Sequence, residues 1–389
     1  MTLMHHRIDG PSAAPTVLLA NSLGTTFHMW DEQIAPLTEH VQVLRYDHRG
    51  HGPSPAPPGP YSIAGLGGDV LELLDHLGLE RVSVAGLSLG GMVGIWLAAN
   101  HPERVDRLVL CATAPVLGPK DMWASRAALV RAGGTASLLP DLFERWFTPR
   151  SCSDRPDMIE RFTEMLSAVD GEGYACCCEA IASMDQRNEL SRITAPTMCI
   201  FGAADPVTPP EAGEVLRRQI AEAGLVVIPR AAHLANVEQP AAFTRAIIEH
   251  LVGDSLDRGL ARRRAVLGDD YVDRALREAS VFTAPFQDFI TRYAWGEIWS
   301  RPGLPRETRQ LLTIAMLAAL GRQEELELHL RAAGAAGVSR EAIREVLLQT
   351  AIYAGVPAAN SAFAIAKRVL AETETAEAEG NGAAAGGSG

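Results

Sequence analysis

The sequence has no long uninterrupted apolar run. Across its 389 residues, no segment approaches the roughly 20 consecutive apolar residues that a membrane-spanning helix needs. The first residues also lack the basic stretch followed by an apolar stretch that marks a secretory signal. These two absences favour a cytoplasmic protein and predict no contact with a membrane.

Cysteines spaced for disulfides or metal binding, and clusters of basic residues, are missing as well. Six cysteines occur, three of them consecutive at 176–178, and their spacings fit neither a disulfide framework nor a zinc site. We therefore expect reduced structural thiols and no metal. The formal net charge is −12, and no block of Lys and Arg is present to neutralise phosphates, which argues against a nucleic-acid partner. An anionic substrate would have to be held by individual arginines.

Two patterns of secondary structure divide the chain, whose length favours two domains. In the first part, short runs rich in apolar and β-branched residues alternate with helix-like stretches. This alternation predicts an α/β fold with a mostly parallel sheet covered on both faces. The strand-like runs are 16–21, 41–47, 81–86, 106–114, 197–202 and 225–229.

Helical patterns alone occupy the remainder of the sequence. Within the α/β part, residues from about 117 to 192 are expected to form a helical lid over the carboxyl edge of the sheet. We therefore expect two domains with a connection and a tail. The expected segments are an α/β domain at 1–252, a polar linker at 253–261, an all-helical domain at 262–372 and a disordered low-complexity tail at 373–389.

A candidate nucleophile stands where a predicted strand turns into a helix. The run 81–86 leads into Gly86-Leu87-Ser88-Leu89-Gly90, which matches G-x-S-x-G, and then into a helical stretch. In this context the serine lies on a strained elbow at a helix N-terminus, where the amide of Leu89 can donate to a developing oxyanion. An ordinary buried turn serine is the alternative, and the strand-to-helix context favours the nucleophile.

A nucleophilic serine needs a base and an acid that orients the base, and in this fold they follow in the order Ser, acid, His. Asp205 lies directly after the predicted strand 197–202, and His233 follows the strand 225–229. Asp185 is the rival acid, although it follows no predicted strand. We therefore expect Ser88, Asp205 and His233 to form a catalytic triad.

The second oxyanion donor is expected in NSLGTTFHMW, residues 21–30, where the backbone amides of Ser22 and Leu23 are the candidates. Together with YDHRGHGPS and the serine elbow, this stretch resembles the α/β-hydrolase superfamily across residues 1 to about 252. The stretches NSLGTTFHMW, GLSLGGMVGIWLA, ERWFTP and DQRNELSRITAPTMCIFGAADPVTPP narrow the resemblance to 3-oxoadipate enol-lactonases.

The resemblance implies hydrolysis of an anionic lactone. Ser88, deprotonated by His233, would attack the lactone carbonyl, while direct attack by water with Ser88 only polarising the substrate stays open. Because the substrate carries a carboxylate, a cationic anchor is expected in the lid. For each arginine considered, a solvated surface position is the alternative. The candidate substrate-binding residues are Trp123, Arg126, Arg145, Trp146 and Arg187.

The helical part contains no glycine-rich phosphate loop, no metal-ligand cluster and no serine elbow, which predicts chemistry without a cofactor. RRAVLGDDYVDRAL, FTAPFQDFITRYAWGEIWSRPGL, TRQLLTIAMLAALGR and ELELHLRAAGAAGVSREAIREVLLQTAIYAGVPAANSAF resemble 4-carboxymuconolactone decarboxylases. Related peroxidase-like proteins use a C-x-x-C-x-x-x-H site. Arg322 and Glu325 occupy those cysteine positions here, so redox chemistry is not expected.

Three residues define the expected decarboxylase site. Arg322, Glu325 and His329 are spaced three and four apart, which predicts one shared helix face. The resemblance implies that His329 acts as proton donor or oxyanion partner, that Arg322 anchors a carboxylate and that Glu325 orients the imidazole. Glu345 and Tyr353 are secondary candidates, and a solvated Glu–His pair is the alternative.

These features leave three hypotheses for the whole protein. The first is a bifunctional enzyme in which the decarboxylase makes the enol-lactone that the lactonase opens, as two steps of the β-ketoadipate pathway. The second is a generic esterase with a noncatalytic helical oligomerisation module, and the third, a redox partner, is opposed by the missing thiol pair. Apolar helices such as LLTIAMLAAL predict a homo-oligomer assembled through the C-terminal domain.

Overall fold

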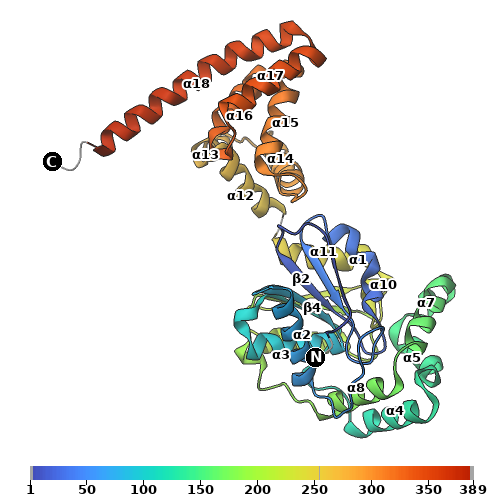
Figure 1. Ribbon diagram of the computed structural model, residues 1–389. Helices are drawn as coiled ribbons and strands as arrows, with labels where there is room; N and C mark the ends of the chain where they lie inside the picture. Colours follow the sequence, from blue (N-terminus) through green and yellow to red (C-terminus); the bar gives the residue numbers. More distant parts are fainter. Residues whose placement is uncertain (1–2, 254, 386–389) are drawn as a thin grey trace. The chain divides into compact units, whose positions relative to one another are not determined.

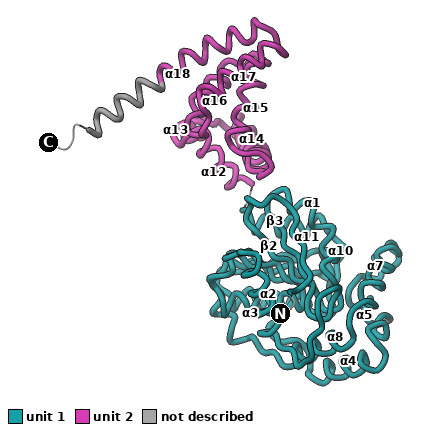
Figure 2. Tube along the Cα trace, viewed as in Figure 1, with its two compact units in different colours: residues 1–253 teal, residues 254–389 magenta. Residues whose placement is uncertain are grey.

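The computed structural model describes residues 3–253 and 255–385, without the side chains of 140 and 373–385. The chain divides into two compact units, residues 1–253 and 254–389 (Figure 2). The tail expected to be disordered, 373–389, lies outside the residues that are described in full.

The first unit is built on a seven-stranded sheet with the order β1-β3-β2-β4-β5-β6-β7. All neighbouring strands pair in parallel except β1 and β3. The inner strands β2 and β4 are buried along their whole length, as expected of a sheet covered on both faces, and the α/β prediction is confirmed. The strands are β1 (His6–Asp9), β2 (Thr16–Ala20), β3 (Gln42–Tyr46), β4 (Val82–Leu87), β5 (Val105–Cys111), β6 (Thr197–Gly202) and β7 (Gly224–Ile228).

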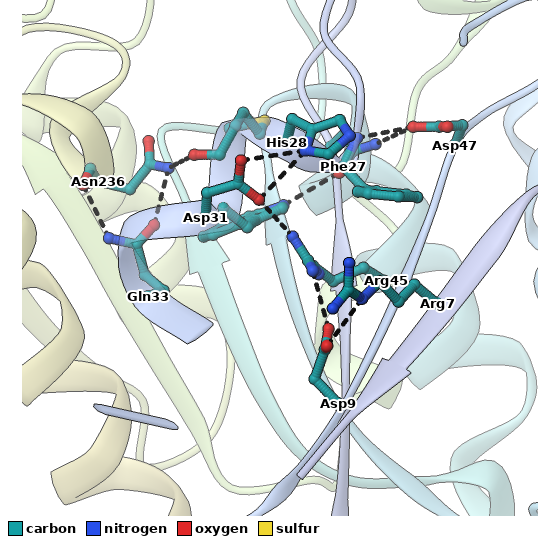
Figure 3. A network of polar contacts seen from close by, with 12 residues as sticks. Arg7, Asp9, Phe27, His28, Asp31, Gln33, Arg45, Asp47 and Asn236 are labelled. Atoms are coloured by element: carbon teal, nitrogen blue, oxygen red, sulfur yellow. Dashed lines mark hydrogen bonds and ion pairs between the residues drawn. The ribbon is translucent and has the colours of Figure 1, made fainter. Parts of the chain in front are cut away.

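Strand β1 was missed by the sequence pattern. Its four residues, HRID, are only partly buried, and they pair antiparallel with β3 at the edge of the sheet. A short polar strand has no apolar run by which it could be recognised. Instead, the buried guanidinium of Arg45 in β3 donates to Asp9 of β1 at 2.8 Å and to Asp31 at 2.6 Å (Figure 3).

Helices cover the sheet on both faces. Helix α3 is apolar around nearly its whole circumference because it packs between the sheet and α2. The side chain of Ser62 caps α2 by accepting from the amide of Gly65. The helices that flank the sheet are α1 (Asp31–Leu37), α2 (Ile63–His76), α3 (Leu89–Asn100), α9 (Pro210–Gln219), α10 (Ala235–Glu238) and α11 (Pro240–Val252).

The expected helical lid lies between β5 and β6, and its helices gather on one side of the unit (Figure 1). Trp146, Phe147 and Phe162 pack edge to face at its centre, with ring centroids 5.2 to 6.3 Å apart. The lid is also bonded to the loop after β3, because the amide of Asp170 donates to the carbonyl of Gly50 at 2.9 Å. The lid helices are α4 (Lys120–Gly133), α5 (Leu139–Trp146), α6 (Pro149–Asp154), α7 (Pro156–Ser167) and α8 (Gly171–Ser183).

The second unit is all-helical in its described residues, as predicted. Its core contains Ile314, Leu326, Leu330 and Leu347, which come from three different helices. Residues 291–298 form a π-helix, η5, which is a rare conformation that often marks functional sites. The elements are α12 (Ser255–Leu267), α13 (Asp269–Arg277), α14 (Ala284–Ile290), η5 (Thr291–Ile298), α15 (Arg306–Ala319), α16 (Gln323–Ala332), α17 (Arg340–Ala354) and α18 (Val356–Ala385).

The structure differs from the expected linker at 253–261, because α12 begins at Ser255. The sequence of this stretch is polar, yet the backbone of α12 packs tightly against that of η5. A Cβ added at Gly259 would lie 2.0 Å from the carbonyl oxygen of Thr291, and one at Gly296 would lie 2.1 Å from that of Ser255. Two glycines therefore let the helix backbones touch, a contact that hydrophobic periodicity does not reveal.

No helix in the described part of the chain is long and apolar enough to cross a membrane.

We predict that Gly259→Ala destabilises the second unit by about 1–3 kcal/mol, because the new methyl group overlaps a backbone carbonyl that cannot move aside. Gly68→Ala is the control: it also lies inside a helix, but nothing lies within 4 Å of its added Cβ, and the change should be neutral or stabilising by up to about 1 kcal/mol. Urea unfolding followed by circular dichroism measures both. Equal stability of the two variants would contradict the helix contact.

Candidate active site

The candidate nucleophile lies at a strained turn between β4 and α3. Ser88 has φ 55° and ψ −110°, a conformation that residues other than glycine rarely adopt. The turn is this sharp because its flanking glycines sit against backbone. A Cβ at Gly86 would lie 2.1 Å from the carbonyl oxygen of Gly90, and one at Gly90 would lie 2.2 Å from that of Ala20. The elbow therefore presents Ser88 beside the end of β2.

The expected acid and base meet at the carboxyl ends of β6 and β7. Nδ1 of His233 lies 2.9 Å from Oδ2 of Asp205, and both side chains are almost fully buried. Oδ1 of Asp205 accepts from the amides of Val207 and Thr208 at 2.8 and 3.1 Å. Burial alone would raise the pKa of Asp205, but the charge and hydrogen bond of His233, with the Thr208 bonds, hold it below its usual value. The carboxylate thus stays ionised and fixes Nδ1 of the imidazole as a donor.

Two backbone amides are available beside Ser88. Leu89 is the first residue of α3, where the amide has no partner within the helix. In the loop after β2, the amide of Ser22 donates to the sulfur of Met29 at 3.3 Å and that of Gly24 donates to Nε2 of His51 at 3.0 Å. Among the described residues the Leu23 amide between them has no acceptor, so the structure favours Leu23 over Ser22 as the second oxyanion donor.

A cavity of about 170 Å³ joins these groups to the lid. Ser88, His233 and Leu23 line its floor, and no carboxylate is among the lining residues. Four of the expected substrate-binding residues line it as well, and the guanidinium of Arg126 lies 5.0 Å from the ring centre of Trp123. The four are Trp123, Arg126, Arg145 and Trp146. Two arginines without a competing carboxylate make this cavity suited to an anion.

The fifth expected substrate-binding residue lies elsewhere. Arg187 is exposed and forms an ion pair with Asp185, and neither residue lines the cavity. Because the two are only two positions apart in an exposed turn, they pair locally with each other. Asp185 is therefore not placed to orient His233, and Arg187 is not placed to bind substrate.

Two buried residues of this site were missed by sequence reasoning. Tyr174 of the lid lines the cavity, and among the described residues its hydroxyl has no hydrogen-bond partner. Glu238 accepts from the amides of Ala232 and Thr148, which ties the loop before His233 to the lid. Tyr174 lies in α8 and Glu238 at the end of α10, and only the folded arrangement shows that the first lines the cavity and the second holds the loop before His233.

In the second unit, His329 packs beside two indoles, those of Trp295 and Trp299, which contact each other with ring centroids 4.9 Å apart. Its ring lies almost parallel to those of Trp295 and Trp299, with centroids 6.4 and 5.8 Å away. Gln310 donates to the carbonyl of His329 at 2.6 Å, and its Oε1 lies 3.5 Å from Nδ1. Burial lowers the pKa of His329 to about 4, against an opposing effect of Glu325. The imidazole is therefore neutral at pH 7.

Of the other expected decarboxylase residues, Glu325 is the one whose charge acts on this histidine. Arg322 is the exposed N-cap of α16 and lacks helical dihedral angles, so it does not share the helix face that the spacing predicted. Glu325 is exposed at the first turn of the helix, and Glu345 is exposed and pairs with Arg344 at 3.4 Å. Tyr353 is 83% exposed. The missed neighbours are Trp295, Trp299 and Gln310, since apolar and amide side chains carry no catalytic pattern.

No metal site is formed by the described residues, since three His, Cys, Asp or Glu side chains nowhere gather closely enough to hold an ion.

Comparisons with known proteins divide the chain as the two units do. The model of the alpha/beta hydrolase fold family matches residues 15–240, and that of the Carboxymuconolactone decarboxylase family matches 284–368. A 3-oxoadipate enol-lactonase of Acinetobacter baylyi is 42% identical over 63% of this chain and 91% of its own length. The crystal structure of an enol-lactonase from Burkholderia xenovorans superposes with a TM-score of 0.63 at 42% identity, covering 64% of this chain and 96% of its own.

The second unit has a relative of a different kind. A 4-carboxymuconolactone decarboxylase of Acinetobacter baylyi is 50% identical over 29% of this chain and 84% of its own length. The chain therefore belongs to the α/β-hydrolase fold family in its first unit and to the carboxymuconolactone decarboxylase family in its second.

Proposed function

We propose that the chain catalyses two consecutive reactions of the β-ketoadipate pathway. The second unit decarboxylates 4-carboxymuconolactone to 3-oxoadipate enol-lactone, and the first unit hydrolyses that lactone to 3-oxoadipate. The main support is the pairing of a serine elbow and a buried Asp205–His233 hydrogen bond with a cavity lined by two arginines. The relatives of the two units are a 3-oxoadipate enol-lactonase and a 4-carboxymuconolactone decarboxylase, and loss of CO2 from 4-carboxymuconolactone leaves an enol-lactone that the first unit could open.

Lactone opening uses Ser88 as the nucleophile. As Oγ attacks the carbonyl carbon, Nε2 of His233 takes the hydroxyl proton, and Asp205 stabilises the imidazolium that forms. The amides of Leu23 and Leu89 hold the tetrahedral oxyanion. Collapse breaks the ring C–O bond, and His233 protonates the enol oxygen that leaves. Water activated by His233 then releases the acyl group, and the enol converts to the ketone.

The substrate carboxylate binds in the lid part of the cavity. Arg126 and Arg145 supply positive charge there, and the walls of Trp123 and Trp146 exclude water, which strengthens the attraction. The unpartnered hydroxyl of Tyr174 provides a further donor. This arrangement favours an anionic lactone over a neutral ester.

Decarboxylation in the second unit needs no external electron sink. The departing carboxylate is vinylogous to the lactone carbonyl, so the electron pair of the broken C–C bond spreads into a dienolate as CO2 leaves. Because His329 is neutral and packs beside Trp295 and Trp299, we assign it the role of hydrogen-bond donor to the developing oxyanion rather than of a charged acid.

Copies of the chain associate through the second unit, which exposes many large apolar side chains. Val281 and Phe282 are more than 90% exposed, and Ile352 and Leu320 more than 70%. An apolar surface of this kind is typical of an interface, and a second copy could bring groups to Arg322 and Glu325 that one chain lacks.

We also propose that both reactions take place in the cytoplasm, where the six free cysteines stay reduced.

We predict that Ser88→Ala blocks the second reaction only. With 4-carboxymuconolactone as substrate, CO2 release should continue at the unmodified rate while the enol-lactone accumulates, because the nucleophile is lost in one unit and the other is untouched. Absorbance of the lactone and trapping of CO2 measure the two steps. A folded Ser88→Ala protein that still forms 3-oxoadipate at the unmodified rate would contradict the role of Ser88.

The role of His329 can be tested with two substitutions. His329→Ala should lower CO2 release by about 100-fold or more and leave hydrolysis of separately supplied enol-lactone unchanged. His329→Gln keeps a neutral donor and should retain more decarboxylase activity than His329→Ala. If both variants release CO2 normally, the second unit does not use His329, and a protein with no decarboxylase activity in any form is an esterase with a helical oligomerisation module.

We expect light scattering with size-exclusion chromatography to give a mass well above the 41.7 kDa of one chain. Phe282→Asp should reduce that mass, because it places a charge in the proposed interface. Val227→Asp, at a 42% exposed position of the first unit, is the matched control and should leave it unchanged. A monomeric unmodified protein would refute the association.

A further inference from the structure

A buried histidine outside the triad holds the loop that carries the Leu23 amide. His51 lies in the turn after β3 and has no exposed surface. It lies against the loop after β2 on one side and near the lid on the other, where its ring centre is 6.5 Å from that of Tyr174. The proposed mechanism does not use its imidazole.

The hydrogen bonds of His51 fix its protonation. Nδ1 lies 2.9 Å from the carbonyl oxygen of Arg49, which can only accept, so Nδ1 carries the proton. Nε2 accepts from the amide of Gly24 at 3.0 Å and must therefore hold a lone pair. Burial favours this neutral form by lowering the pKa of His51 to about 4, with the Arg49 bond and the charge of Asp170 acting in the other direction.

The amide that donates to His51 belongs to Gly24, the residue directly after the proposed oxyanion donor Leu23. Gly24 has φ +81°, and its amide is fixed by the imidazole, while the Ser22 amide is fixed by the sulfur of Met29. The Leu23 amide between these two anchors remains free to face the cavity. Removing the imidazole that accepts from the Gly24 amide would let this short segment rotate about the dihedral angles of Leu23.

We propose that His51 is a positioning residue that orients the Leu23 amide toward the tetrahedral oxyanion formed at Ser88. This inference rests on the proposed lactone hydrolysis. It assigns His51 no contact with substrate, and its effect is confined to the stage at which negative charge develops on the carbonyl oxygen.

The same turn connects the oxyanion loop to the lid. The residue before His51, Gly50, accepts from the amide of Asp170, whose side chain caps α8 by accepting from the amide of Gly173. A Cβ at Gly50 would lie 2.6 Å from the Cα of Gly173, so the turn and the lid helix touch through backbone. The position of the lid therefore helps to set that of His51, and His51 sets that of Gly24.

The test compares two replacements of His51 in the full-length protein. The amide oxygen of Gln reaches the place of Nε2 and can accept from Gly24, whereas Phe fills the space without an acceptor. We expect His51→Phe to lower kcat for the enol-lactone about 10- to 100-fold, somewhat less than removal of a whole oxyanion donor, with KM within about twofold of the unmodified value. His51→Gln should recover most of kcat.

A second measurement separates oxyanion positioning from general damage. Phenylboronic acid forms a tetrahedral adduct with the hydroxyl of Ser88, whereas 3-oxoadipate binds as a product whose carboxylate carbon is trigonal. In His51→Phe the affinity for the boronic acid should fall in parallel with kcat, and that for 3-oxoadipate should not change. His250→Phe is the control, because it also removes a histidine bond to a backbone carbonyl, that of Pro196 at 3.1 Å, but lies away from the cavity. It should leave both affinities and kcat unchanged.

Two results would overturn the proposal. One is an unchanged kcat in a folded His51→Phe protein, and the other is an equal loss of affinity for the boronic acid and the product. Should His51→Phe not fold, His51→Asn, whose shorter side chain cannot reach the Gly24 amide, takes its place, and equal kcat for the Asn and Gln variants would likewise overturn it. If the unmodified protein hydrolyses no lactone, the proposed function fails, while the boronic acid measurement still tests His51.

Discussion

The close approach of three backbone segments at Gly86 and Gly90 is the constraint on which the first active site depends. With hydrogen in place of a Cβ at both positions, β4 turns into α3 against the end of β2, and Ser88 is held at φ 55°. This geometry places the proposed nucleophile in the same cavity as Leu23 and directly before Leu89, the first residue of α3. A side chain at either glycine would displace backbone, so the proposed nucleophile and the proposed oxyanion donors are positioned together.

Around this elbow, buried polar contacts hold the remaining loops. Asp47 accepts from the amide of Phe27 at 2.6 Å, and Asn236 donates to the carbonyl of Met29 at 2.8 Å, so the segment after Leu23 is anchored from two sides (Figure 3). His51 adds a third anchor at Gly24. Such preorganised donors stabilise a transition state without rearranging during the reaction. The active site therefore depends on loops that are rigid through hydrogen bonding as well as packing.

Most of the first unit could be predicted from sequence because its signals are local. Apolar runs marked six of the seven strands, and the order of Ser88, Asp205 and His233 relative to those strands indicated which residues meet. Strand β1, Tyr174 and Glu238 were missed because their roles come from edge pairing or from burial by distant segments. In the second unit, helix spacing alone misplaced Arg322, since a helix start shifted by one residue removes it from the shared face. Contacts between helices, such as that of Gly259 with η5, leave no periodic signal.

The two units combine different catalytic strategies for consecutive reactions on anionic lactones. The first uses a buried Asp205–His233 hydrogen bond and oriented amides, and the second packs a neutral imidazole beside two indoles. The most direct test supplies 4-carboxymuconolactone to the purified chain and measures CO2 and 3-oxoadipate together. The account predicts that both form in equal amounts from one protein. Hydrolysis of supplied enol-lactone with no CO2 from 4-carboxymuconolactone would contradict it.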